Sequence, residues 1–171
     1  MASIGALAIT AAATLLGVLI PTLASLWLNH ESNVQTRLYR NHEKRTGVAE
    51  EYLRAFGTFR RYIRDYAVAR GTEADAKYQV MVAAARTTAD TRELLRLYFD
   101  QTVQEYADQA GSFLGKMQWR AEQMVQNSDD DFIELESYDD SAKEARNVLI
   151  NSMKSQLGEH LAQVKRQAAK G

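Results

Sequence analysis

Seven carboxylates and no basic residue lie between Asp129 and Asp140, which makes this stretch the densest group of side chains able to do chemistry. Alternating carboxylates can bind Ca²⁺, but an EF-hand loop also needs glycine at its sixth position and glutamate at its twelfth. Counted from Asp129, those positions hold Glu134 and Asp140. The stretch therefore predicts a solvated acidic loop over 127–140 that docks on the rest of the protein or on a protein partner. The residues expected to contact such a partner are Asp129, Asp130, Asp131, Glu134 and Glu136.

The three histidines, His30, His42 and His160, fall in no metal-binding or catalytic pattern. A di-metal site in a helical bundle needs glutamate three residues before histidine on two helices, and none of the three has one. The chain also has no cysteine and no glycine-rich phosphate loop. The sequence therefore predicts no catalytic residues, no cofactor and no metal site. An enzyme with a site assembled from scattered residues is kept as an alternative.

Nine basic residues lie between Arg37 and Arg70. The first four follow an uncharged segment, and each could add about 1 kcal/mol of attraction to anionic lipid head groups. The competing interpretation is that cations on the cytoplasmic side of a membrane anchor need no ligand. The candidate lipid contacts are Arg37, Arg40, Lys44 and Arg45.

A second basic group, Arg54, Arg61 and Arg64, shares roughly one face of the predicted helix. Nucleic acid binds such faces. Acidic residues such as Glu51 and Asp65 are interspersed with these arginines, so the solvated side of an amphipathic helix is the favoured interpretation. No nucleic-acid partner is expected.

Residues 3–28 contain no charged side chain. A helix of this length spans about 39 Å, which exceeds the roughly 30 Å hydrocarbon core of a bilayer. A cleaved signal peptide is the alternative, but it would need basic residues before a shorter apolar run. We therefore predict a single-pass transmembrane anchor over 1–30. Because the flanking cations lie only on its C-terminal side, we expect the N-terminus outside the cell membrane and the rest of the chain in the cytoplasm.

Small residues recur at four-residue steps within the predicted anchor, at Ala13, Gly17, Pro21 and Ser25. Such rows let two helix backbones approach closely. Self-association of the anchor is therefore expected, although small residues are common in membrane helices in any case.

Apolar periodicity predicts that the rest of the chain is helical, in keeping with its lack of proline after Pro21. Capping boxes are expected at Asp90–Glu93 and Ser141–Glu144, and Gly71 is expected to end the first helix. The predicted helices cover about 29–70, 73–86, 91–126 and the residues after Asp140. The break at 87–90 is the least marked, so the second and third helices could be one bent rod.

Short connections between helices favour antiparallel neighbours. The predicted fold is thus all-α: a transmembrane helix followed by an up-and-down bundle of about four helices. Residues 31–47 form a basic juxtamembrane neck continuous with the first helix, and 48–171 form the cytoplasmic bundle. The buried stripe of the first helix is expected to be Val48, Tyr52, Phe56, Phe59, Ile63 and Tyr66.

An anchor, a basic neck and a helical bundle together resemble a common plan among small bacterial membrane proteins. The likeness involves the 52–56 stretch and the expected helix break between Ala84 and Leu95, and it assigns no role to any residue. The expected function is a non-enzymatic, membrane-anchored interaction or scaffold module whose partners are the lipid bilayer and another protein or a second copy. No small-molecule substrate is indicated. A membrane-disrupting or pore-forming effector, with several anchors gathered in a ring, is the other alternative.

Overall fold

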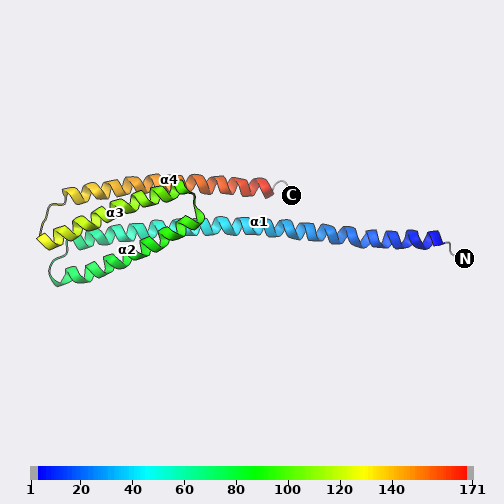
Figure 1. The fold of residues 1–171 in the computed structure, drawn as a ribbon, viewed down its shortest axis with the longest axis horizontal. Coiled ribbons are helices and arrows are strands. Elements are labelled where there is room, and N and C mark those ends of the chain that lie inside the picture. Colours follow the sequence, from blue (N-terminus) through cyan, green and yellow to red (C-terminus); the bar gives the residue numbers. More distant parts are fainter. Residues whose placement is uncertain (1–3, 169–171) are drawn as a thin grey trace. The chain divides into compact units, whose positions relative to one another are not determined.

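The structure is a computed structural model that describes the backbone of residues 4–168 and the side chains of residues 25, 33–34 and 36–166. It contains four helices and, over that backbone, no strand (Figure 1). The all-α prediction is confirmed. The helices are α1 (Ile4–Ala67), α2 (Thr72–Tyr98), α3 (Gln101–Asn127) and α4 (Ile133–Ala168).

The chain divides into two compact units. One unit comprises residues 42–161 and contains the bundle, in which the four helices run alternately in opposite directions (Figure 1). Connections of a few residues, at 68–71, 99–100 and 128–132, join them. Such short connections force each helix to return beside the one before it.

The other unit comprises residues 1–41 and 162–171. Leu38 is half-buried and Val164 is buried within the described part of this unit. The segment expected to form a neck, 31–47, lies entirely within α1, which passes Gly47 without a break.

The predicted transmembrane helix receives no support from the structure. Among the described residues, no helix is both long enough and apolar enough to cross a membrane. The segment on which the prediction depends, residues 3–28, lies outside the residues whose side chains are described, Ser25 excepted.

The core of the bundle follows the predicted stripe of α1. Five of its six residues are buried and Val48 packs against them half-buried. The facing stripe of α3 combines alanines with larger side chains at steps of three and four residues, so that the helices approach closely. The α3 stripe is Val103, Ala107, Ala110, Leu114, Met117, Ala121 and Met124. At the centre, the fully buried Tyr52 hydroxyl donates a hydrogen bond to the Ala107 carbonyl at 3.3 Å.

The expected break at 87–90 is wrong, because α2 continues to Tyr98. Threonine hydroxyls in this stretch bond one turn back along the same helix: Thr88 Oγ1 donates to the Ala84 carbonyl at 2.9 Å. The chain turns instead at Asp100, whose side chain accepts from the Val103 N–H at 3.1 Å. Asp100, rather than Asp90, is therefore the helix cap.

The acidic loop is also much shorter than predicted. Helix α3 ends at Asn127, Ser128 adopts a left-handed conformation, and α4 begins at Ile133. Most of the residues expected in the loop thus form the first two turns of α4. The capping box at Ser141 is wrong as well, since the Ser141 hydroxyl donates to the Ser137 carbonyl inside α4.

Gly71 was expected to end α1, but it lies just before α2. Helix α1 ends at Ala67, and Gly71 lies at φ 59° and ψ −141°, immediately before α2. Glycine adopts this conformation without steric cost. The last carbonyl of α1 is capped by a side chain instead: Arg70 Nη1 donates to the Ala67 carbonyl at 3.2 Å and to the Ala69 carbonyl, in the connection, at 2.9 Å.

Candidate functional site

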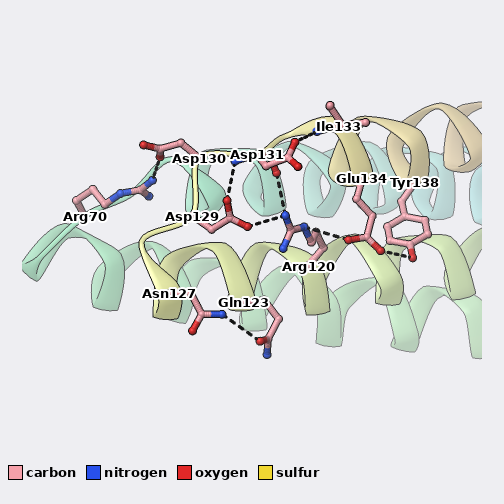
Figure 2. Close-up of polar contacts among 10 residues, drawn as sticks. All are labelled: Arg70, Arg120, Gln123, Asn127, Asp129, Asp130, Asp131, Ile133, Glu134 and Tyr138. Carbon is pink, nitrogen blue, oxygen red and sulfur yellow. Dashed lines mark hydrogen bonds and ion pairs between the residues drawn. The ribbon is translucent and has the colours of Figure 1, made fainter.

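The acidic residues after α3 form a bonded corner rather than a loose loop (Figure 2). At its centre lies Arg120 of α3, whose side chain is only 13% exposed. Arg120 Nη2 donates to Asp129 Oδ2 at 2.7 Å and to the Asp131 carbonyl at 3.0 Å. Its Nε lies 3.2 Å from Glu134 Oε2, close enough for an ion pair but without hydrogen-bond geometry. The corner therefore places one guanidinium against two carboxylates.

Asp129 and Asp131 also bond to the backbone of the corner. Asp129 Oδ1 accepts from the Asp131 N–H at 2.9 Å, and Asp131 Oδ1 accepts from the Ile133 N–H at 3.0 Å. The first of these bonds, followed by the bond from Arg120, holds the pKa of Asp129 below its ordinary value. Carboxylates that cap the first turn of α4 also interact favourably with the helix dipole.

Two further acidic residues proposed for partner binding, Asp130 and Glu136, lie on the surface away from Arg120. Asp130 pairs with Arg70 across the corner, and its side chain is 81% exposed (Figure 2). Glu136 is exposed and makes no ion pair within the described part of the chain. The role of the acidic residues in binding a partner stays a prediction.

An ion pair joins α1 to α4 at Asp139, a residue that the sequence analysis placed in the loop. Its side chain is 6% exposed. Arg60 donates to both carboxylate oxygens, with Nη2 2.7 Å from Oδ2, and Lys143 Nζ lies 3.1 Å away. Arg64 approaches to 3.9 Å. Burial acts to raise the pKa of Asp139, but the hydrogen bonds from Arg60 and Lys143 outweigh it and the pKa is lowered.

A helical period across the acidic segment is the signal that could have revealed this contact. Leu135, Asp139, Ala142 and Leu149 are buried and lie at steps of three, four or seven residues. Such spacing marks one helix face. The density of acidic residues concealed it, because an aspartate on the buried face is uncommon.

On the other flank of α1, an open groove runs between α1 and α2. Its volume is about 430 Å³. Small and apolar side chains line it, and Val80 remains 46% exposed. The only charged residues at the groove are Glu51 and Arg54 of α1. The remaining lining residues are Ala55, Thr58, Tyr62, Ala83, Ala84 and Thr87.

His42 and His160 lie side by side, a contact that no sequence pattern indicated. Their rings stack with centroids 5.7 Å apart and planes 6° from parallel. Both Nδ1 atoms are buried without a hydrogen-bond partner, as is Arg45 Nε. Burial, followed by the charge of Arg45 and the presence of His42, lowers the pKa of His160.

The candidate lipid contacts lie along α1. Arg37, Arg40 and Lys44 are exposed, whereas Arg45 is half-buried. Their contact with lipid stays a prediction. Of the residues expected to pack two anchors together, Ala13, Gly17 and Pro21 lie in α1 but outside the described side chains, and Ser25 is exposed.

Within the described residues, no three His, Asp or Glu side chains gather as a metal site would require. Comparison of the chain with family models, with curated proteins and with solved structures gives no match. The function proposed below therefore depends on the surfaces described above and on the sequence.

Proposed function

We propose that this protein is a non-enzymatic interaction module, anchored in the cell membrane by residues 3–28, whose bundle associates with a second copy through the α1–α2 groove. The groove is the observation that carries the proposal. It leaves Val80 about half exposed beside Ala83 and Ala84, and these small side chains would let another helix approach closely.

The charges at the groove favour a second copy as its occupant. Glu51 and Arg54 lie three residues apart on α1, and neither makes an ion pair within the described residues. In a dimer with twofold symmetry, the same surface of both copies forms the interface, and the two surfaces run in opposite directions. Glu51 of each copy can then face Arg54 of the other, so that the surface is complementary to itself.

Anchoring rests on the sequence. The uncharged segment 3–28 is long enough for a bilayer, and the first cations follow on one side only. Both features support a single-pass anchor with the bundle in the cytoplasm. Helix α1 continues from Ile4 into the bundle, which supplies a direct connection between the two.

The groove is tested by the molar mass of the purified full chain in detergent, measured by light scattering over a range of concentrations. Val80→Glu should shift the dimer to monomer, because it places a charge in the groove. The matched control is Val148→Glu on α4, since Val148 is exposed to a similar degree, 41% against 46%, and lies outside the groove.

A charge exchange tests the twofold arrangement. Glu51→Arg alone should weaken the dimer because two arginines then meet across the axis. Adding Arg54→Glu should restore it. A wild-type chain that is monomeric at all concentrations, or a double variant as weak as the single one, would contradict the second-copy assignment.

Anchoring is tested by washing membranes with alkaline carbonate. The full chain should stay in the membrane pellet, whereas deletion of residues 3–28 should release it. Because the chain has no cysteine, the variants Ser3→Cys and Ser155→Cys can report orientation. A membrane-impermeant maleimide should label only the first in intact cells. Release of the full chain by carbonate would refute the anchor and leave the groove untouched.

A further inference from the structure

A second hollow lies between α1 and α4, on the side of Arg60 away from the acidic corner. It has a volume of about 400 Å³, within the range of small-ligand sites. Its lining contains three cations, an amide and no carboxylate. The lining residues are Phe56, Gly57, Arg60, Lys143, Arg146 and Asn147.

The charges around this hollow are not balanced. Arg60 and Lys143 both pair with Asp139, and Lys143 also pairs with Asp140 at 2.7 Å. Arg146 makes no ion pair with any described residue, and its Nε is buried without a hydrogen-bond partner. Asp139 and Asp140 thus serve Arg60, Arg64 and Lys143, and neither pairs with Arg146, so the positive charge of Arg146 is in surplus at the hollow.

From this imbalance we infer that the hollow binds a phosphate group, held by Arg146 with support from Lys143 and Asn147. A guanidinium matches phosphate oxygens with two parallel hydrogen bonds. Such bonds would satisfy the unpartnered Arg146 Nε and neutralise the surplus charge. The inference concerns a different flank of α1 from the groove and does not depend on the proposed function.

Gly57 keeps one wall of the hollow open. A Cβ atom built at this position would meet nothing within 4 Å, so a side chain can start here without a clash at its first carbon. Gly57→Leu therefore fills the hollow while leaving every charge in place. Leucine is also the better helix former, so α1 should not be weakened.

Binding is tested by titrating the purified full chain with inorganic phosphate at low ionic strength in a calorimeter. The wild-type chain should bind, and Arg146→Gln should weaken affinity about tenfold or more, the loss expected for a charge-assisted hydrogen bond. Gly57→Leu should weaken it similarly. The control is Arg86→Gln, which removes an exposed cation of α2 and should leave affinity within about twofold.

The source of the phosphate is tested with glycerol phosphate and with short-chain phosphatidic acid. Tighter binding of the first indicates a soluble phosphate ester, and tighter binding of the second a lipid head group. The inference fails if the wild-type chain does not bind phosphate. It also fails if Arg146→Gln and Arg86→Gln weaken binding equally, because binding would then reflect only the overall charge.

Discussion

The two flanks of α1 are held by different forces. Toward α4, the contact depends on Asp139, whose charge is stabilised by Arg60 across the helix interface. Toward α2, the Tyr66 ring lies 5.5 Å from the Tyr78 ring between centroids, and small side chains line the groove. The Thr88 hydroxyl on this flank bonds within its own helix. The buried carboxylate on the α4 flank thus needs tertiary structure to find its partner, whereas the Thr88 hydroxyl on the α2 flank is satisfied as soon as the helix forms.

This difference has consequences for both proposed sites. At the groove, the Thr87 hydroxyl bonds within α2, whereas Glu51 and Arg54 have no ion-pair partner among the described residues, so the groove favours a partner that supplies opposite charges. A flank with a buried carboxylate and surplus cations has a fixed arrangement and a field that favours anions.

Removing the charge of Asp139 should give the largest effect. Asp139→Asn leaves Arg60 without its counter-ion, whereas Lys143 retains Asp140. Breaking such a pair typically costs about 3–5 kcal/mol when both partners are buried. Because the Arg60 side chain is 26% exposed, we expect a loss of about 2–3 kcal/mol in the free energy of unfolding. Urea denaturation measures it.

Two matched variants make this comparison sharper. Thr88→Val on the α2 flank should change stability by no more than about 1 kcal/mol, because its hydroxyl bonds only within α2. Asp130→Asn removes the exposed partner of Arg70 and should cost less than about 1 kcal/mol. If all three variants lose similar stability, the two flanks do not differ as described.

The free energy of unfolding should also decrease at alkaline pH, because Tyr52 is buried in the core between the two flanks. Burial, the largest cause, raises the pKa of Tyr52 to about 12 from an ordinary 10.0. The folded state therefore retains the phenolic proton more strongly than the unfolded state does. The stabilisation that results is complete below pH 10 and is lost as the pH rises toward 12. The loss should reach about 2–3 kcal/mol.

Comparison of the wild-type chain with Tyr52→Phe isolates this contribution. The variant should lack that part of the alkaline loss, although near neutral pH it forgoes the bond to the Ala107 carbonyl, worth about 1 kcal/mol. Tyr39→Phe serves as the control, since Tyr39 is 44% exposed. Denaturation curves at several alkaline pH values give the measurement, and an unchanged loss in Tyr52→Phe would exclude the buried phenol as its cause.

A smaller effect is expected at mildly acidic pH. Because the pKa of His160 is lowered from 6.5, its neutral form is favoured in the folded state. Its contribution is complete above pH 6.5 and is lost as the pH falls below that value. The contribution of Asp139 to stability is lost in a separate pH range. Because the pKa of this carboxylate is lowered, its contribution is complete above about pH 4 and is lost as the pH falls below that value.

His160→Phe should keep the ring stacked on His42 and remove the dependence on pH between 7 and 5. Thermal melting at the two ends of this range measures the difference. An equal decrease in melting temperature for the wild-type chain and the variant would show that another group causes it.

Much of the fold could be predicted because it depends on local periodicity. The buried stripe from Tyr52 to Tyr66 follows from helical spacing alone, and the lack of proline after Pro21 favours long helices. The turns were harder to place. Thr87–Asp90 has the composition of a break, but hydroxyl bonds to the preceding turn keep it helical, and Asp100 provides the cap.

The candidate sites were predicted less well, because they depend on which residues meet across helices. Acidic composition was visible, but not that Arg120 would bind Asp129 and Glu134 or that Asp139 would turn inward. The pairing of His42 with His160 joins residues far apart in the chain. The residue spacing within a single helix does not indicate a contact of this kind.

The helical class, the apolar stripe of α1 and the uncharged segment at residues 3–28 can be recognised in the amino-acid sequence, because each depends on residues close together in the chain. Where the charges are balanced depends on how the helices pack. Packing placed Arg60 on Asp139, left Arg146 without an ion pair among the described residues and opened the groove beside Val80. Coulomb and packing energies depend on distances in space, which neighbouring helices fix only once they have packed together.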